Sequence, residues 1–149
     1  GCAGHLVGQP VGAVAVVPSR SHYQAGAPSM LQRLCVRELS DGMPLVDIRS
    51  APGSTSDRRV HRDAFDVITP PEASHVMLID DTWQRATTLS AAALRASGAH
   101  HVSVLVLARW LDPTYGPTRE FLTFMQQHAW HNPQDVCPFT LDGICPRKT

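Results

Sequence analysis

Charge of either sign is scarce in this 149-residue chain, in which only 17% of the residues are charged. Thirteen basic side chains balance 13 acidic ones, and this zero net charge argues against a nucleic-acid partner. Long apolar runs are also missing: none reaches the roughly 20 residues that a membrane-spanning helix needs, so no membrane association is expected. No basic segment followed by an apolar run opens the chain, so we predict no signal peptide and a cytoplasmic location.

Cysteine is sparse, and no two of the four cysteines have the C-x-x-C spacing. Near the two ends of the chain lie six potential zinc ligands: Cys2, His5, His128, His131, Cys137 and Cys145. Their spacing matches no strong zinc pattern, so free thiols are the favoured interpretation and a structural zinc site is the alternative. The glycine-rich dinucleotide and P-loop motifs are absent, as is any Ser-His-Asp or Cys-His pattern of a nucleophilic enzyme.

Hydrophobic residues make up 43% of the chain, which is enough for one folded domain with a sizeable core. We therefore expect a single domain over residues 1–149, in which residues 112–149 form a C-terminal helix and an irregular tail. The chain opens with Gly1-Cys2 rather than with Met, which is compatible with a piece of a longer protein.

Apolar periodicity predicts an alternation of strands and helices. Strands are expected over residues 11–17, 64–68, 76–79 and 102–108, with a short one near Val46 and Ile48. Helices are expected over residues 29–39, with Ser29 as the N-cap, and over residues 87–96 and 118–130. Residues 76–108 then form a βαβ unit, which indicates an α/β fold with a mostly parallel, doubly wound sheet flanked by helices.

Two adjacent carboxylates, Asp80 and Asp81, follow the apolar strand over residues 76–79. Ligands of open α/β sheets bind at the C-terminal ends of the strands, and the helix start that follows is an anion site. Such a pair suits two ribose hydroxyls, contacted directly or through Mg²⁺. An isolated Asp-Asp pair is more often part of a turn, but the apolar strand before it and the helix start after it favour a ligand site here.

Two further segments carry groups that suit phosphate. Ser19, Arg20 and Ser21 follow the first strand and are candidates for a pyrophosphate site, because hydroxyls and a guanidinium fork fit phosphate oxygens. Residues 49–62 contain four Arg and one His, and their Ser-, Pro- and Gly-rich first part is predicted to be a mobile loop. For each segment the alternative is a solvated surface loop.

Residues 76–88 resemble the thirteen-residue signature of the type I phosphoribosyltransferases, in which four apolar and two acidic positions precede a short loop that ends in Thr. Residues 16–20, 59–67, 97–102 and 107–109 are similar to the competence protein F branch of that family. The resemblance implies that Asp80 and Asp81 contact the ribose of phosphoribosyl pyrophosphate together with Mg²⁺, and that Ser19, Arg20 and Ser21 bind its pyrophosphate. It also implies that the 5′-phosphate is held by Thr82, Arg85, Ala86, Thr87 and Thr88.

The function implied by this resemblance is transfer of ribose 5-phosphate to a nitrogen acceptor with release of pyrophosphate, and the implied oligomeric state is a homodimer. The resemblance also implies that residues 49–62 close over the pyrophosphate. Arg85 stands where Thr or Ser is usual and Ala86 where Gly is usual. These replacements motivate the alternative, a binding or regulatory module that keeps the fold without the chemistry. Trp83 takes an aliphatic position of the signature, and we expect it to pack on the loop, with stacking on a base or ribose as the alternative.

Overall fold

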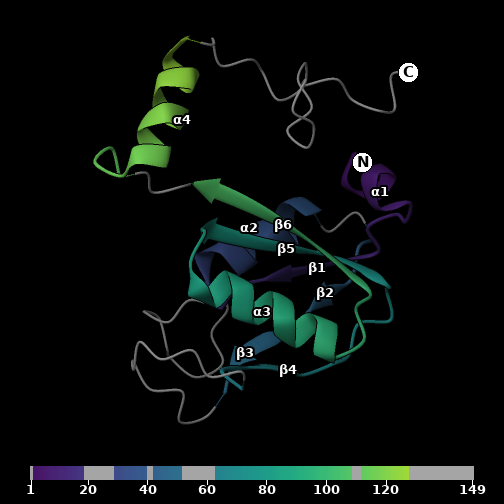
Figure 1. The fold of residues 1–149 in the computed structure, drawn as a ribbon. Helices are drawn as coiled ribbons and strands as arrows, with labels where there is room; N and C mark the ends of the chain where they lie inside the picture. The colour runs from purple at the N-terminus through teal and green to yellow at the C-terminus, as the bar shows by residue number, and fades with distance from the viewer. Residues whose placement is uncertain (1, 19–28, 40–41, 52–62, 109–111, 128–149) are drawn as a thin grey trace.

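A four-stranded parallel sheet forms the centre of the computed structural model (Figure 1). The structure describes residues 2–18, 29–39, 42–51, 63–108 and 112–127. In spatial order the strands are β2 (Leu45–Val46), β1 (Ala13–Val16), β5 (His75–Thr82) and β6 (His101–Ala108). Because the strands are parallel, the C-terminal ends of β1, β5 and β6 lie along one edge of the sheet.

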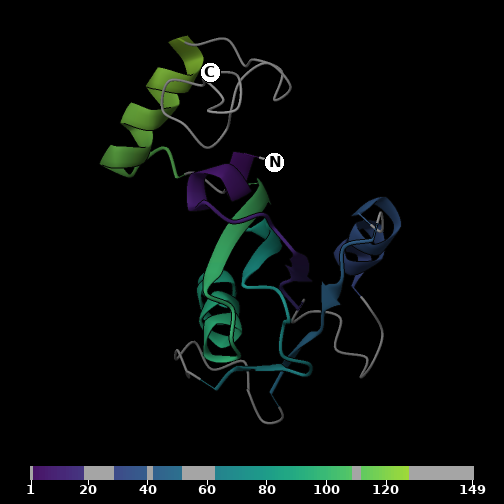
Figure 2. The ribbon, with the colours of Figure 1, turned by 90° about the vertical axis from the view of Figure 1, so that its right-hand side faces the viewer.

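Helices cover both faces of this sheet, as Figure 2 shows. Helix α3 (Arg85–Ala96) lies on one face and helix α2 (Met30–Leu39) on the other. At the start of α2 the Ser29 hydroxyl accepts a hydrogen bond from the amide of Gln32 (3.1 Å), and the Gln32 side chain accepts one from the amide of Ser29 (2.7 Å). This reciprocal capping box confirms Ser29 as the N-cap. The predicted α/β class with a mostly parallel sheet is confirmed.

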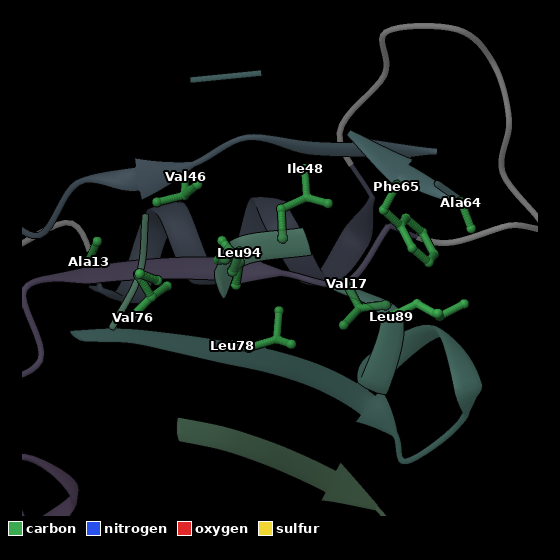
Figure 3. Close-up of a cluster of buried hydrophobic side chains, with 12 residues drawn as sticks. Ala13, Val17, Val46, Ile48, Ala64, Phe65, Val76, Leu78, Leu89 and Leu94 are labelled. Atoms are coloured by element: carbon green, nitrogen blue, oxygen red, sulfur yellow. The ribbon is translucent and has the colours of Figure 1, made fainter. Parts of the chain in front are cut away.

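Two apolar clusters hold the layers together. The larger one joins the α3 face of the sheet to α3 and to the segments around Ile48 and Phe65 (Figure 3). Leu78 and Leu94 are fully buried in it. The smaller cluster contains Val14, Val16, Cys35 and Ile79 on the α2 face. Cys35 is a free thiol whose pKa is raised by burial, as the sequence interpretation of unpaired cysteine expects.

A small antiparallel ribbon lies beside the parallel sheet and corrects one prediction. Strand β3 (Ile48–Ser50) pairs with β4 (Phe65–Val67), so residues 46 and 48 belong to two strands and not to one. Val46 pairs with Ala15 of β1, and the carbonyl of Asp47 then accepts a hydrogen bond from the amide of Ile68 (3.0 Å). The chain thus leaves the sheet at Asp47, because Ile48 is buried against α3 and the ribbon partner.

Several element ends differ from the predicted ones. Helix α1 (Cys2–Val7) was not predicted, and helix α4 (Gly116–Gln127) starts two residues before its predicted start. Helix α3 ends where predicted, because Gly98 has a φ of 114°, a conformation that favours glycine. Among the described residues, no helix is both long and apolar enough to cross a membrane.

Candidate functional site

The acidic pair lies within β5 and not in the loop that follows it. The strand extends to Thr82, because its backbone pairs with β6 as far as Ala108. Asp80 is 5% exposed on the α3 side of the sheet, whereas Asp81 is exposed. The Asp81 carboxyl is nevertheless close enough to raise the pKa of Asp80. Asp80 and Asp81 thus both lie near the C-terminal end of β5 in different surroundings, and their role in ligand binding stays a prediction.

Asp80 is tied to the first turn of α3. The hydroxyl of Thr87, itself fully buried, donates a hydrogen bond to the Asp80 carboxylate. The same hydroxyl accepts a hydrogen bond from the amide of Gln84, the N-cap of α3 (3.0 Å). Thr87 thus joins the end of β5 to the start of α3 and fixes the carboxylate of Asp80 relative to the helix.

Burial is the main influence on the ionisation of Asp80. It raises the pKa of this carboxyl, because the charged form loses solvation. The neighbouring Asp81 raises this pKa further through its hydrogen bond and its charge, while the bond from Thr87 opposes the rise. A cation bound beside the pair would relieve this cost.

The chemistry of the pair fits Mg²⁺, which prefers oxygen ligands and keeps several waters. Within the described residues no group of three or more Asp, Glu, His or Cys side chains surrounds a possible metal position. A magnesium ion held by Asp80 and Asp81 would therefore complete its coordination with water and with oxygens of a bound ligand.

The predicted phosphate loop is the first turn of a helix. Helix α3 begins at Arg85, two residues before its predicted start, so Arg85 and Ala86 have helical backbone. No described residue other than glycine has a positive φ, and Ala86 therefore stands in the glycine position without strain. The first turn of a helix is a general anion site, and in this turn the amide of Thr87 donates to the carbonyl of Gln84 (3.2 Å).

The predicted phosphate-binding side chains divide into two groups. Arg85 and Thr88 are exposed in the first turn of α3, and Thr82 and Ala86 are half-buried beside it. Thr87, in contrast, is fully buried, and its hydroxyl serves Asp80 and Gln84. The Thr87 hydroxyl thus faces the strand, and its contact with a ligand stays a prediction.

Trp83, which we expect to pack on the loop, is 55% exposed. It lies between the exposed Asp81 and the exposed start of α3 at Arg85. The chain has only two residues, Trp83 and Gln84, between the strand and the helix.

The predicted pyrophosphate residues Ser19, Arg20 and Ser21 lie outside the described residues. The described chain stops at Pro18, one residue after the amide of Val17 donates to the carbonyl of Ile79 (2.9 Å). The chain therefore leaves β1 next to Ile79, the residue before Asp80 on β5.

Of the Arg-rich segment 49–62, the structure describes residues 49–51. Arg49 forms an exposed ion pair with Asp47, with an N–O distance of 2.6 Å. Among the terminal Cys and His residues, Cys2 and His5 lie in α1, where His5 is exposed. The other zinc candidates, His128, His131, Cys137 and Cys145, lie outside the described residues.

Sequence reasoning did not identify Thr87 as the partner of Asp80. The available signal was an acid at the strand end and a threonine seven residues later, on the helix that folds back over it. Comparisons with protein family models, with curated proteins and with solved structures find no match to this chain.

Proposed function

We propose that the protein binds phosphoribosyl pyrophosphate with Mg²⁺ and transfers ribose 5-phosphate to a nitrogen acceptor, as a type I phosphoribosyltransferase-like enzyme. The observation that carries the proposal is the acidic pair at the end of the central parallel strand, directly followed by the first turn of α3. Only three residues, Thr82 to Gln84, separate the acidic pair from the helix start. The carboxylates suit ribose hydroxyls, and the helix start suits a phosphate.

The two acids have distinct parts in this proposal. Asp81 is exposed and offers its carboxylate to a ribose hydroxyl directly. Asp80 is held in place by the hydrogen bond from Thr87. Its carboxylate adds a second negative charge, beside that of Asp81, next to the cation that the pyrophosphate brings. Magnesium, when bound, supplies charge stabilisation to the leaving pyrophosphate. The phosphate at the other end of the sugar meets the amides of Arg85 and Ala86 and the hydroxyl of Thr88.

The antiparallel ribbon supports the same proposal. Strands β3 and β4 are joined through residues 52–62, and Phe65 packs in the cluster that also contains Leu89 of α3. The ends of the segment that we expect to close over the pyrophosphate are therefore anchored beside the helix that would bind the 5′-phosphate. Closure there would exclude water, which would otherwise hydrolyse the donor.

Calorimetric titration of the intact chain with phosphoribosyl pyrophosphate and Mg²⁺ tests the proposal. We expect Asp81→Asn to weaken binding by roughly 10- to 100-fold, the range for loss of a hydrogen bond to a charged group. Combining it with Asp80→Asn should abolish binding. Glu72→Gln is the matched control, because Glu72 is exposed and lies before β5, at the opposite edge of the sheet. Unchanged affinity in the double variant would refute the proposed site.

A second assay separates the enzyme from the binding module. Release of pyrophosphate should depend on an added nitrogen acceptor and on Asp81. Tight, Asp81-dependent binding without pyrophosphate release for any purine, pyrimidine or pyridine acceptor would show that the site binds without catalysis. Arg85→Thr and Ala86→Gly would then be the first substitutions to test for recovery of pyrophosphate release.

A further inference from the structure

Trp83 is an exposed aromatic residue beside the proposed ribose site. Its indole is 55% exposed, although a tryptophan is among the side chains that gain most from burial. Residue 81, two positions earlier, is the exposed carboxylate that we assign to a ribose hydroxyl. A large apolar surface is thus left in solvent within two residues of a group that binds a sugar.

The neighbouring strand adds further apolar surface at the same end of the sheet. Leu105 of β6 is opposite Ile79 of β5, and side chains of paired residues lie on the same face. Ile79 belongs to the cluster on the α2 face, and by alternation Asp81 and Leu107 lie on that face too. Leu105 and Leu107 are 40% and 62% exposed, so apolar surface extends along the end of β6 next to Asp81.

We propose that Trp83 is the stacking platform for the planar ring of the acceptor. A planar ring can lie on the indole, with its edge over the apolar end of β6. The carboxylate of Asp81 lies beside this surface and accepts hydrogen bonds, which a ring N–H or the neighbouring ribose hydroxyl can donate. The inference rests on the proposed function, since it assigns the second substrate of the same site.

Binding of nucleotides compared with the bare sugar phosphate tests this assignment. Titration calorimetry with adenosine 5′-monophosphate, uridine 5′-monophosphate and ribose 5-phosphate measures what the ring adds to affinity. We expect at least one nucleotide to bind roughly tenfold or more tightly than ribose 5-phosphate, as stacking of one base on an aromatic side chain typically gives. Trp83→Leu should remove this advantage, Trp83→Phe should keep most of it, and neither should change the affinity for ribose 5-phosphate.

The outcomes separate this inference from the proposed function. If ribose 5-phosphate binds in an Asp81-dependent manner but the ring adds nothing, or adds as much in Trp83→Leu, the stacking role is refuted and the ribose site stands. If no ligand binds, both are refuted. Sedimentation of the same variants tests whether a second copy of this chain covers the Trp83 surface instead. A change from dimer to monomer in Trp83→Leu would show that it does and would overturn the inference. Because Trp83 is exposed, these variants are expected to fold normally.

Discussion

Thr87 in the first turn of α3 donates a hydrogen bond to Asp80 at the end of β5, although seven residues separate them in the chain. This bond connects the strand that carries the acidic pair to the helix that begins the proposed phosphate site. A displacement of α3 would therefore move Asp80, and the two halves of the site are positioned as one unit.

Replacing Thr87 by Val removes the donor while preserving the shape of the side chain. We expect a loss of about 1.5–3 kcal/mol in the free energy of unfolding, the range for a hydrogen bond to a charged group. Thr87→Ser retains the hydroxyl and should lose much less. Urea denaturation of the two variants measures the difference. Equal stability of the Val and Ser variants would show that the bond to Asp80 contributes nothing.

The raised pKa of Asp80 predicts a pH dependence of stability. The folded chain binds a proton at this carboxyl at pH values where the unfolded chain, with the ordinary pKa of 3.8, has already lost it. Protonation of Asp80 therefore adds to the free energy of unfolding. This stabilisation is fully present below pH 3.8 and is lost as the pH rises through the raised pKa of the folded chain. Unfolding free energies measured from pH 3 to pH 8 should contain this downward component with rising pH.

Asp80→Asn isolates that component. The amide keeps an acceptor oxygen for Thr87 but carries no charge to desolvate, so we expect it to be more stable than the natural chain at pH 7 by about 1 kcal/mol. Its difference from the natural chain should shrink at low pH. Asp66→Asn on the exposed side of β4 is the matched control. A variant that is less stable at pH 7 would show that the charge of Asp80 is not costly in the folded state.

Ser90 carries a buried hydroxyl on the sheet-facing side of α3. Its Oγ is buried and has no hydrogen-bond partner within the described part of the chain. Ser90→Ala should stabilise the fold by about 1 kcal/mol, because it removes an unsatisfied polar group and adds a better helix former. Ser90→Leu should destabilise it by about 1–3 kcal/mol through overpacking. Thermal or urea unfolding measures both effects, and a destabilised Ala variant would show that the hydroxyl has a partner.

The sequence predicted the parallel core because its signals are local. The apolar run before Asp80 and the Ser97-Gly98 stop after α3 specify a strand and a helix end on their own. Ser29 and Gln32 specify a helix start in the same way. The positions of strand ends were less predictable, because pairing with β6 extends β5 through polar residues that local propensity would assign to a loop.

Contacts between distant residues escaped prediction for a related reason. No local pattern shows that Thr87 turns toward Asp80, or that Ile48 leaves the strand of Val46 to pair with Val67 in an antiparallel ribbon. Likewise, no local pattern shows that Trp83, in the connection between β5 and α3, is 55% exposed.

His75 is the last example of such a distant contact, and it leads to a test of how the N-terminal segment is attached. Its ring is 1% exposed at the start of β5. Nδ1 lies 2.9 Å from the carbonyl oxygen of Gln9, and Nε2 lies 2.9 Å from the hydroxyl of Ser103 on β6. A carbonyl oxygen can only accept, so Nδ1 carries the hydrogen, and in the neutral ring Nε2 accepts from Ser103.

We expect His75→Phe to destabilise the fold by about 2–4 kcal/mol, because it fills the same space but leaves the Gln9 carbonyl and the Ser103 hydroxyl without this partner. Ser103→Ala should cost less, about 1 kcal/mol, since it breaks one bond and leaves the other. Hydrogen exchange locates the effect: Gly12, whose amide donates to the His75 carbonyl (3.0 Å), should exchange faster in His75→Phe than in Ser103→Ala. Equal exchange in the two variants would show that His75 does not hold the N-terminal segment on the sheet.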